Sequence, residues 1–185
     1  MRRRIVEPAD VSASALAELK SWLGISRPNE DALLTGLLHA SLDVCEGFTG
    51  QAPLSQLVEE RIAPRAGRYS LSSRPVRLLV SAHLAAQDGT LTALEESAYK
   101  IELQAAGTGC VHLLADSEGQ AVVLRLRVGI AETWETTPAA IKQGLIRLAA
   151  FQYRDRDRTG GSGNDAAPPA SVTALWRPWR TLRLR

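Results

Sequence analysis

Three stretches of the chain carry apolar residues at the spacing of a helix. In the first, the apolar positions are Leu16, Leu19 and Leu23. Either Ser12 or Ser14 can cap its beginning, and Gly24 is placed to end it. This pattern predicts a helix over residues 14–24.

The second stretch predicts a helix over residues 29–49. It begins at Asn29, and Glu30 and Asp31 lie where the positive end of the helix dipole stabilises negative charge. Gly50 follows its last turn. Its apolar positions include Leu33, Leu34, Leu37, Leu38, Leu42, Val44, Cys45 and Phe48. This stripe is wide enough to be buried on more than one side of the helix.

The third stretch predicts a helix over residues 138–156. Either Thr136 or Thr137 can cap it, and Pro138 stands at the first helical position, where a missing N–H costs nothing. Its interior is again broadly apolar, through Ile141, Leu145, Ile146, Leu148, Ala149, Phe151 and Tyr153. The alternating charges of residues 154–158 are typical of a solvated helix end rather than of a specific interface.

Between the second and third helices, over residues 54–130, the apolar period changes to two, which indicates strands. In the last such run, Val122, Leu124, Leu126 and Val128 alternate with Val123, Arg125 and Arg127. Asp88 with Gly89, and residues 116–119, are typical of hairpin turns, while residues 73–75 indicate a loop or a sheet edge. We therefore predict an α+β fold, with a helical core of three main helices and an inserted antiparallel β meander with hairpins.

The end of the chain contains two segments whose compositions differ from that of the rest. Residues 159–169 are rich in Gly, Ser and Pro and predict a flexible linker. Residues 170–185 are both apolar and basic, with Trp176, Trp179, four arginines and no carboxylate. Large aromatic residues and arginine dominate binding hot spots, and so short a segment cannot bury its tryptophans by itself. We expect an extended C-terminal arm that docks on another molecule.

Length and composition fit one domain with appendages. We place the domain in residues 1–158. The 185 residues are 45% hydrophobic, enough for one good core. The net charge is only +2, so no global field attracts nucleic acid. No apolar run reaches the length of a membrane span, and no apolar h-region follows the N-terminal arginines, so we expect a protein made and kept in the cytosol. Cys45 and Cys110 lie far apart and outside any CxxC, and we expect buried free thiols.

The chain lacks the common catalytic and nucleotide-binding motifs, including Gly-x-Ser-x-Gly, a Walker loop and His-Glu-x-x-His. His39, His83 and His112 occur singly, so they would form a metal site only by fortuitous convergence. Glu59 and Glu60 are adjacent on a predicted strand, so they point to opposite faces and cannot share a proton. We interpret them as solvent or lumen charges. We predict no catalytic residue, no metal, no cofactor and no enzyme activity.

The order of these elements resembles the head-to-tail connector, or adaptor, proteins of long-tailed bacteriophages. The strings that carry the resemblance are Leu16-Ala-Glu-Leu-Lys20, Glu30-Asp-Ala-Leu-Leu34, Glu46-Gly-Phe-Thr-Gly50, Pro138-Ala-Ala-Ile-Lys-Gln143 with Phe151 and Tyr153, and Val172-Thr-Ala-Leu-Trp-Arg-Pro-Trp179. None of these strings is specific alone, since acidic-capped leucine helices are common. Their order and spacing cover nearly the whole chain. Members of this family also occur in prophages and in gene transfer agents.

The resemblance implies a structural role in the neck of a phage or phage-like particle that is assembled in the bacterial cytoplasm. Such adaptors form a ring, usually of twelve copies, beneath the portal protein. They offer a platform to the next tail-completion (stopper) protein, and DNA passes through the lumen without specific binding. In the family the helices form the ring core, the strands project toward the tail side, and the C-terminal segment reaches the portal. The expected portal-binding residues are Leu175, Trp176, Pro178 and Trp179 as anchors, with Arg177, Arg180 and Arg183 pairing with portal carboxylates.

Two questions stay open at the level of sequence. The wide apolar stripes of the second and third helices are buried either against a neighbouring copy in the ring or entirely within the chain. The arm could also belong to a nucleic-acid-binding module, with arginine on phosphates and tryptophan stacked on bases. That alternative predicts a broader basic face than a net charge of +2 offers, and steep salt dependence. A membrane-surface role for the arm is disfavoured by Pro178, which interrupts an amphipathic helix.

Overall fold

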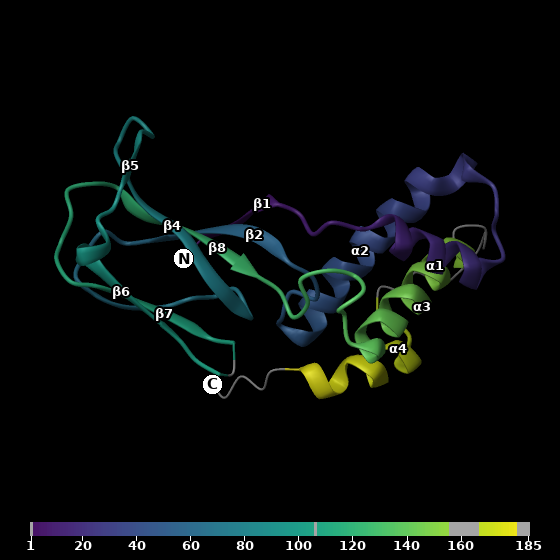
Figure 1. The fold of residues 1–185 in the computed structure, drawn as a ribbon. Coiled ribbons are helices and arrows are strands. Elements are labelled where there is room, and N and C mark those ends of the chain that lie inside the picture. Colours follow the sequence, from purple (N-terminus) through teal and green to yellow (C-terminus); the bar gives the residue numbers. More distant parts are fainter. Residues whose placement is uncertain (1, 106, 156–166, 181–185) are drawn as a thin grey trace. The chain divides into compact units, whose positions relative to one another are not determined.

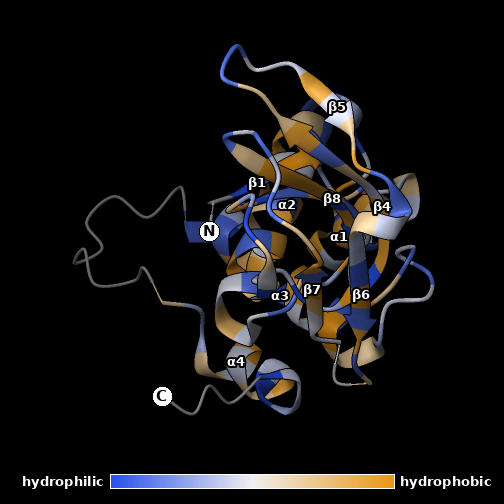
Figure 2. Ribbon diagram, turned by 90° about the vertical axis from the view of Figure 1, so that its left-hand side faces the viewer, coloured by the Kyte–Doolittle hydropathy of each residue, from blue (hydrophilic) through white to orange (hydrophobic). Residues whose placement is uncertain are grey.

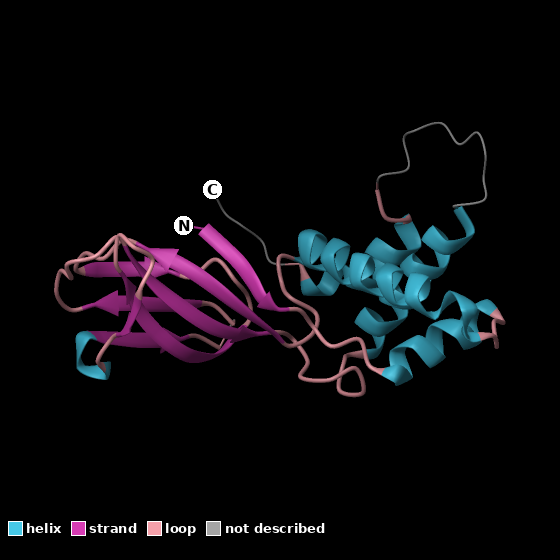
Figure 3. Cartoon of the chain, turned by 90° about the horizontal axis from the view of Figure 1, so that it is seen from above, coloured by secondary structure: helices cyan, strands magenta, loops and turns pink. Residues whose placement is uncertain are grey.

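The computed structural model describes residues 2–105, 107–155 and 167–180, whose elements are labelled in Figure 1. Internal contacts divide the chain into two compact units. The sheet unit comprises Met1–Pro8 and Ser55–Gly129, and the helical unit comprises Ala9–Leu54 and Ile130–Arg185. Each described α-helix belongs to the helical unit and each described strand to the sheet unit. Figure 3 colours helices cyan and strands magenta, and the cyan turn among the strands is the 3-10 helix Glu96–Ala98. The predicted α+β class is confirmed.

The helical unit contains the three expected helices and a further one. They are α1 (Ala13–Leu23), α2 (Asp31–Thr49), α3 (Ala139–Asp155) and α4 (Ala170–Trp176), with 3-10 helices at Pro28–Glu30 and Arg177–Trp179. Ser12, rather than Ser14, caps α1, because its Oγ accepts the N–H of Ala15 at 3.4 Å. Gly24 and Gly50 end α1 and α2 in the left-handed conformation, at φ 72° and 73°. These local signals explain why the helix ends could be read from the sequence.

The core of the helical unit is built around α3, which α1, α2 and α4 all contact. The buried residues of α3 are Ile141, Gly144, Leu145, Ile146, Leu148, Ala149 and Ala150. Leu34, Leu38 and Leu42 of α2 enter the same core. Hydrophobic and hydrophilic colours both occur on the helical ribbons that Figure 2 leaves visible. Most of the wide apolar stripes are therefore buried within the chain, whereas Leu33 of α2 is 43% exposed. Within the described residues, no helix combines the length and apolarity needed to cross a bilayer.

The two cysteines are buried free thiols, as predicted. Cys45 lies in the core of the helical unit. Burial, with a smaller contribution from the negative charge of Glu46, raises the pKa of the Cys45 thiol from 9.0 to about 12. A thiol with so high a pKa stays protonated near neutral pH, so Cys45 is not a ready nucleophile.

The sheet unit holds two antiparallel sheets. Its strands are β1 (Arg2–Glu7), β2 (Gln56–Ile62), β3 (Gly67–Ser70), β4 (Val76–Ala85), β5 (Leu91–Ala93), β6 (Tyr99–Leu103), β7 (Gly109–Leu113) and β8 (Ala121–Val128). One sheet has the order β1-β2-β8-β4-β5 and the other β3-β7-β6. The pair β4–β5 confirms the hairpin expected at Asp88 and Gly89. The hairpin expected at residues 116–119 is wrong, because the flanking strands β7 and β8 lie in different sheets, and β7 pairs with β6 instead. The expected meander is corrected, because β8 lies between β2 and β4.

Glu59 and Glu60 of β2 are both buried, which corrects their interpretation as solvent or lumen charges. The Glu60 carboxylate accepts the N–H and the hydroxyl of Ser72, at 3.1 and 2.9 Å, and the N–H of Ser73 at 2.7 Å. Glu59 contacts arginine side chains instead. Neighbouring residues of a strand point to opposite faces, so the two carboxylates meet different partners. Glu60 thus fixes the loop between β3 and β4.

Candidate partner-binding surface

Trp176 anchors the C-terminal arm in the chain's own helical unit. Helix α4 packs on α3, and the side chains of Val172 and Trp176 are buried there. The indole Nε1–H of Trp176 donates to the Ile141 carbonyl oxygen at 3.3 Å, and its ring centroid lies 6.2 Å from that of Phe48. Gly144 of α3 leaves room for the indole, since a Cβ at this position would lie 2.2 Å from Nε1. The buried indole therefore has a complete set of neighbours within the chain.

The other expected portal-binding residues differ in exposure. Leu175 and Trp179 are half-buried, whereas Arg177, Pro178 and Arg180 are exposed. Arg183 lies outside the described residues, as does most of the predicted linker. The described arm is helical, so the expectation of an extended arm is corrected. The reason is long-range: the space for Trp176 is provided by Gly144, far away in the sequence.

Two further contacts hold the end of the arm. Gln51, just after α2, donates from Nε2 to the carbonyl oxygen of Trp179 at 2.5 Å. The Arg180 guanidinium lies over the Phe48 ring, 5.5 Å from its centroid, which is the geometry of a cation–π contact. These contacts leave the exposed side of Arg177 and Pro178 as the surface that the arm presents outward.

Replacing Gly144 by alanine is expected to displace the arm, because the added methyl group takes the space of the Trp176 indole. We expect a loss of stability of about 1–3 kcal/mol from overpacking. Tryptophan fluorescence should shift to longer wavelength as Trp176 gains contact with water. Gly47→Ala on α2 is the matched control, because nothing lies within 4 Å of a Cβ there. An unchanged emission spectrum and unchanged stability in Gly144→Ala would contradict the proposed anchoring.

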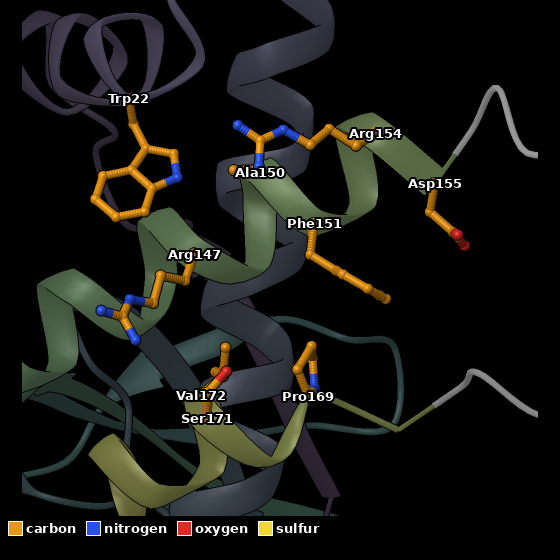
Figure 4. Close-up of a pocket in the computed structure, with 9 residues that line it drawn as sticks. All are labelled: Trp22, Arg147, Ala150, Phe151, Arg154, Asp155, Pro169, Ser171 and Val172. Atoms are coloured by element: carbon orange, nitrogen blue, oxygen red, sulfur yellow. The ribbon is translucent and has the colours of Figure 1, made fainter.

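A groove of about 300 Å³ lies beside the arm (Figure 4). Its lining comes from α1, α3 and the beginning of α4, and includes Trp22, Arg147, Phe151, Arg154, Pro169 and Val172. Trp22 is 45% exposed, although its indole is among the largest apolar groups of the chain. The Arg147 guanidinium lies 5.9 Å from the centroid of the Trp22 ring.

The chemistry of this groove suits a partner side chain that is apolar and has a carboxylate nearby. Trp22 and Phe151 offer apolar surface, and Arg147 and Arg154 flank it with positive charge. Asp155 is the acidic residue in the lining. An exposed tryptophan next to arginine is the composition of binding hot spots. We define this groove and the outward residues Arg177 and Pro178, with the exposed Arg180 beside them, as the candidate partner-binding surface.

Sequence reasoning missed the groove, although the signals were present. Trp22 follows the helical spacing of α1 only loosely, since it stands beside the core positions Leu19 and Leu23 rather than among them. Phe151 belongs by its spacing to the apolar interior of α3, but it is only half-buried. A tryptophan next to, rather than within, a buried stripe is the signal that could have identified an exposed aromatic.

The described residues hold no group of three or more His, Cys, Asp or Glu side chains that could bind a metal ion. His39 lies on α2, whereas His83 and His112 lie on β4 and β7. The pKa of Glu135 is lowered, first by a hydrogen bond from the Ser14 hydroxyl at 2.5 Å, and this carboxyl is fully exposed.

Comparison with known proteins identifies the fold. No protein-family model matches the chain, and no curated protein matches it significantly. Among solved structures, a chain in the neck of an empty GTA particle, computed with C6 symmetry, matches with a TM-score of 0.78. Chains from the virion of a native gene transfer agent (GTA) particle and from the neck of a native GTA particle, computed with C12 symmetry, match with TM-scores of 0.76 and 0.74. Each is 24% identical, and each match covers 100% of this chain and 98% of the other.

Proposed function

We propose that this protein is a structural component of the neck of a phage-like particle of the gene transfer agent type. The observation that carries the proposal is the likeness in fold, over the full chain, to chains in the necks of such particles. In this role the protein acts by assembly and not by catalysis. Copies form a closed ring, and the C12 symmetry of one neighbouring particle supports twelve of them. The DNA passes through the lumen of the ring.

Within this proposal, the arm contributes its outward side to the portal protein. Arg177 and Arg180 are exposed and pair with portal carboxylates, with Pro178 between them. Leu175 and Trp179, which are half-buried, add apolar contact at the edge. Trp176 supports the arm from below, because it is buried in the helical unit. The opposite end of the ring offers the platform for the stopper protein.

The groove beside Trp22 gives the proposed neck component a second place of contact. Its apolar lining and its two arginines accept an apolar side chain that has a neighbouring carboxylate. A ring of identical subunits repeats both contacts around its axis, so weak single contacts add up by avidity. This explains how a short arm with few exposed anchors can hold a stable junction.

Charge reversal on the arm tests the docking. Arg177→Glu in a particle-producing strain is expected to give DNA-filled heads without tails and to abolish capture of the purified portal protein. The control is Arg27→Glu, which makes the same change of charge at an exposed position of the same unit. Trp176→Ala is not suitable here, because it would also disturb folding. Normal particles and unchanged portal capture in Arg177→Glu would contradict the proposed docking.

The alternative of a nucleic-acid-binding module that uses the arm is weakened by the burial of Trp176. A base can stack only on an accessible aromatic face, and the Trp176 side chain is 0% exposed. Trp179 is half-buried and offers at most part of its ring. The arm therefore lacks the row of accessible aromatics on which successive bases stack.

A further inference from the structure

The sheet unit contains a cavity lined by arginines that the proposed function does not use. The cavity has a volume of about 400 Å³ and is lined by Arg3, Arg4, Glu59 and Arg61. The first two residues lie on β1 and the others on the neighbouring strand β2. Arg3 is opposite Glu60 in the β1–β2 pair, so its side chain starts from the other face of the sheet, and Arg4, Glu59 and Arg61 form the common side of the lining.

The strand register explains why these side chains meet. Residues directly opposite each other in an antiparallel pair share a face of the sheet, and so do residues two apart on one strand. Arg4 is opposite Glu59 in the β1–β2 pair, and Glu59 is opposite Arg125 in the β2–β8 pair. Arg61 is two residues after Glu59 on β2. Arg4, Glu59, Arg61 and Arg125 therefore form one cluster on one face of the five-stranded sheet, which we call the arginine pocket.

The contacts of Glu59 orient arginine side chains of the pocket. Its Oε1 lies 3.4 Å from Arg61 Nε, and its Oε2 lies 3.9 Å from Arg125 Nε. The Glu59 side chain is only 6% exposed, whereas those of Arg61 and Arg125 are 50% and 38% exposed. The carboxylate therefore lies beneath the guanidinium groups and orients them. One negative charge cannot balance three arginines, so the open side of the pocket is positively charged.

We propose that the arginine pocket binds a phosphate group, either in a nucleic-acid backbone or as free inorganic phosphate. The planar guanidinium fork matches two phosphate oxygens at once, which a point charge such as an ammonium group cannot do. The lining offers no aromatic face for stacking, so binding does not read the sequence of bases. This inference goes beyond the proposed function, and it rests on the sheet unit alone.

Binding of a short labelled duplex DNA, followed by fluorescence anisotropy between about 50 and 200 mM salt, tests the proposal. We expect the pair Arg4→Gln and Arg61→Gln to weaken binding at least about tenfold and to reduce the slope of log K against log salt by about 2. The matched control is the pair Arg65→Gln and Arg68→Gln, exposed positions of the same unit that lose the same charge. Thermal unfolding of both pairs checks that the sheet unit stays folded.

Inorganic phosphate separates the two sources of the ligand. Phosphate that displaces the DNA, or that stabilises the protein against heat only when Arg4 and Arg61 are present, assigns the pocket to phosphate chemistry. Arg61→Lys keeps the charge but loses the fork, and we expect it to bind more weakly than the unaltered protein. The proposal is overturned if both glutamine pairs weaken DNA binding equally, because a general field would then suffice. It is also overturned if the pocket binds neither DNA nor phosphate, or only an acidic peptide.

Discussion

Replacing Trp176 by alanine is expected to lower the free energy of unfolding of the helical unit by about 3–5 kcal/mol, the usual cost of removing a buried tryptophan. The side chain is 0% exposed and lies between α2 and α3. Its removal leaves a cavity beside Gly144, which has no side chain to fill it. Urea denaturation, followed by the circular dichroism of the helices, measures the loss.

The matched control for this variant is Trp22→Ala. Trp22 is also a helical tryptophan of the same unit, but it is 45% exposed, so we expect a loss of about 1 kcal/mol or less. If the two variants lose equal stability, α4 is not docked in solution and the arm is free to act as an extended hook. A large difference between them establishes that the arm folds against its own unit before it meets any partner.

Replacing Glu60 by alanine is expected to destabilise the sheet unit by about 2–4 kcal/mol. Hydrogen bonds to a charged group contribute about 1.5–3 kcal/mol each, and a buried donor left without an acceptor adds its own cost. Glu60 accepts three hydrogen bonds from Ser72 and Ser73, and Ser73 is itself buried. The melting temperature of the sheet unit, measured by calorimetry, should fall accordingly.

Two comparisons separate the loss of these hydrogen bonds from a general effect of removing charge. Glu60→Gln keeps one acceptor oxygen and should lose less stability than Glu60→Ala. Glu102→Ala removes a carboxylate of the same unit that is 63% exposed and paired with Arg68, so its effect should stay within about 0.5 kcal/mol. Equal effects of Glu60→Ala and Glu102→Ala would show that the loop after β3 does not depend on the buried carboxylate.

The helices could be predicted from the sequence because their signals are local. Ser12 and Gly24 delimit α1 within a few residues of its own leucines, and Gly50 ends α2 in the same way. Strand β1 gives no such signal, since Arg2, Arg3 and Arg4 interrupt any apolar alternation. Its position is fixed instead by its pairing with β2, a strand that follows helices α1 and α2 in the sequence.

Long-range packing decided what the sequence could not predict. The insertion of β8 between β2 and β4 depends on which strands pair across the unit, and turn residues do not encode that order. The sequence predicts an arm that docks on another molecule, whereas the described part of the arm packs on its own helical unit. Its nearest partner is α3 of the same chain, where Gly144 admits the indole of Trp176. One glycine inside an apolar helix carries too little information to predict this contact alone.

The docked arm changes how the proposed contact with the portal works. An arm that is already folded loses less conformational entropy on binding than an extended one, so fewer anchors suffice. Arg177 and Arg180 are then held on a rigid element instead of a mobile tail. This is why the proposed contact is best tested at the exposed arginines and not at the buried tryptophan.

The most direct test of the central claim is to locate this chain in particles by cryo-electron microscopy of the neck, without imposed symmetry. The account predicts a closed ring of this chain between head and tail, with the outward side of each arm against the portal and Trp176 still on α3. Absence of the chain from purified particles, or a neck ring built from another protein, would contradict it.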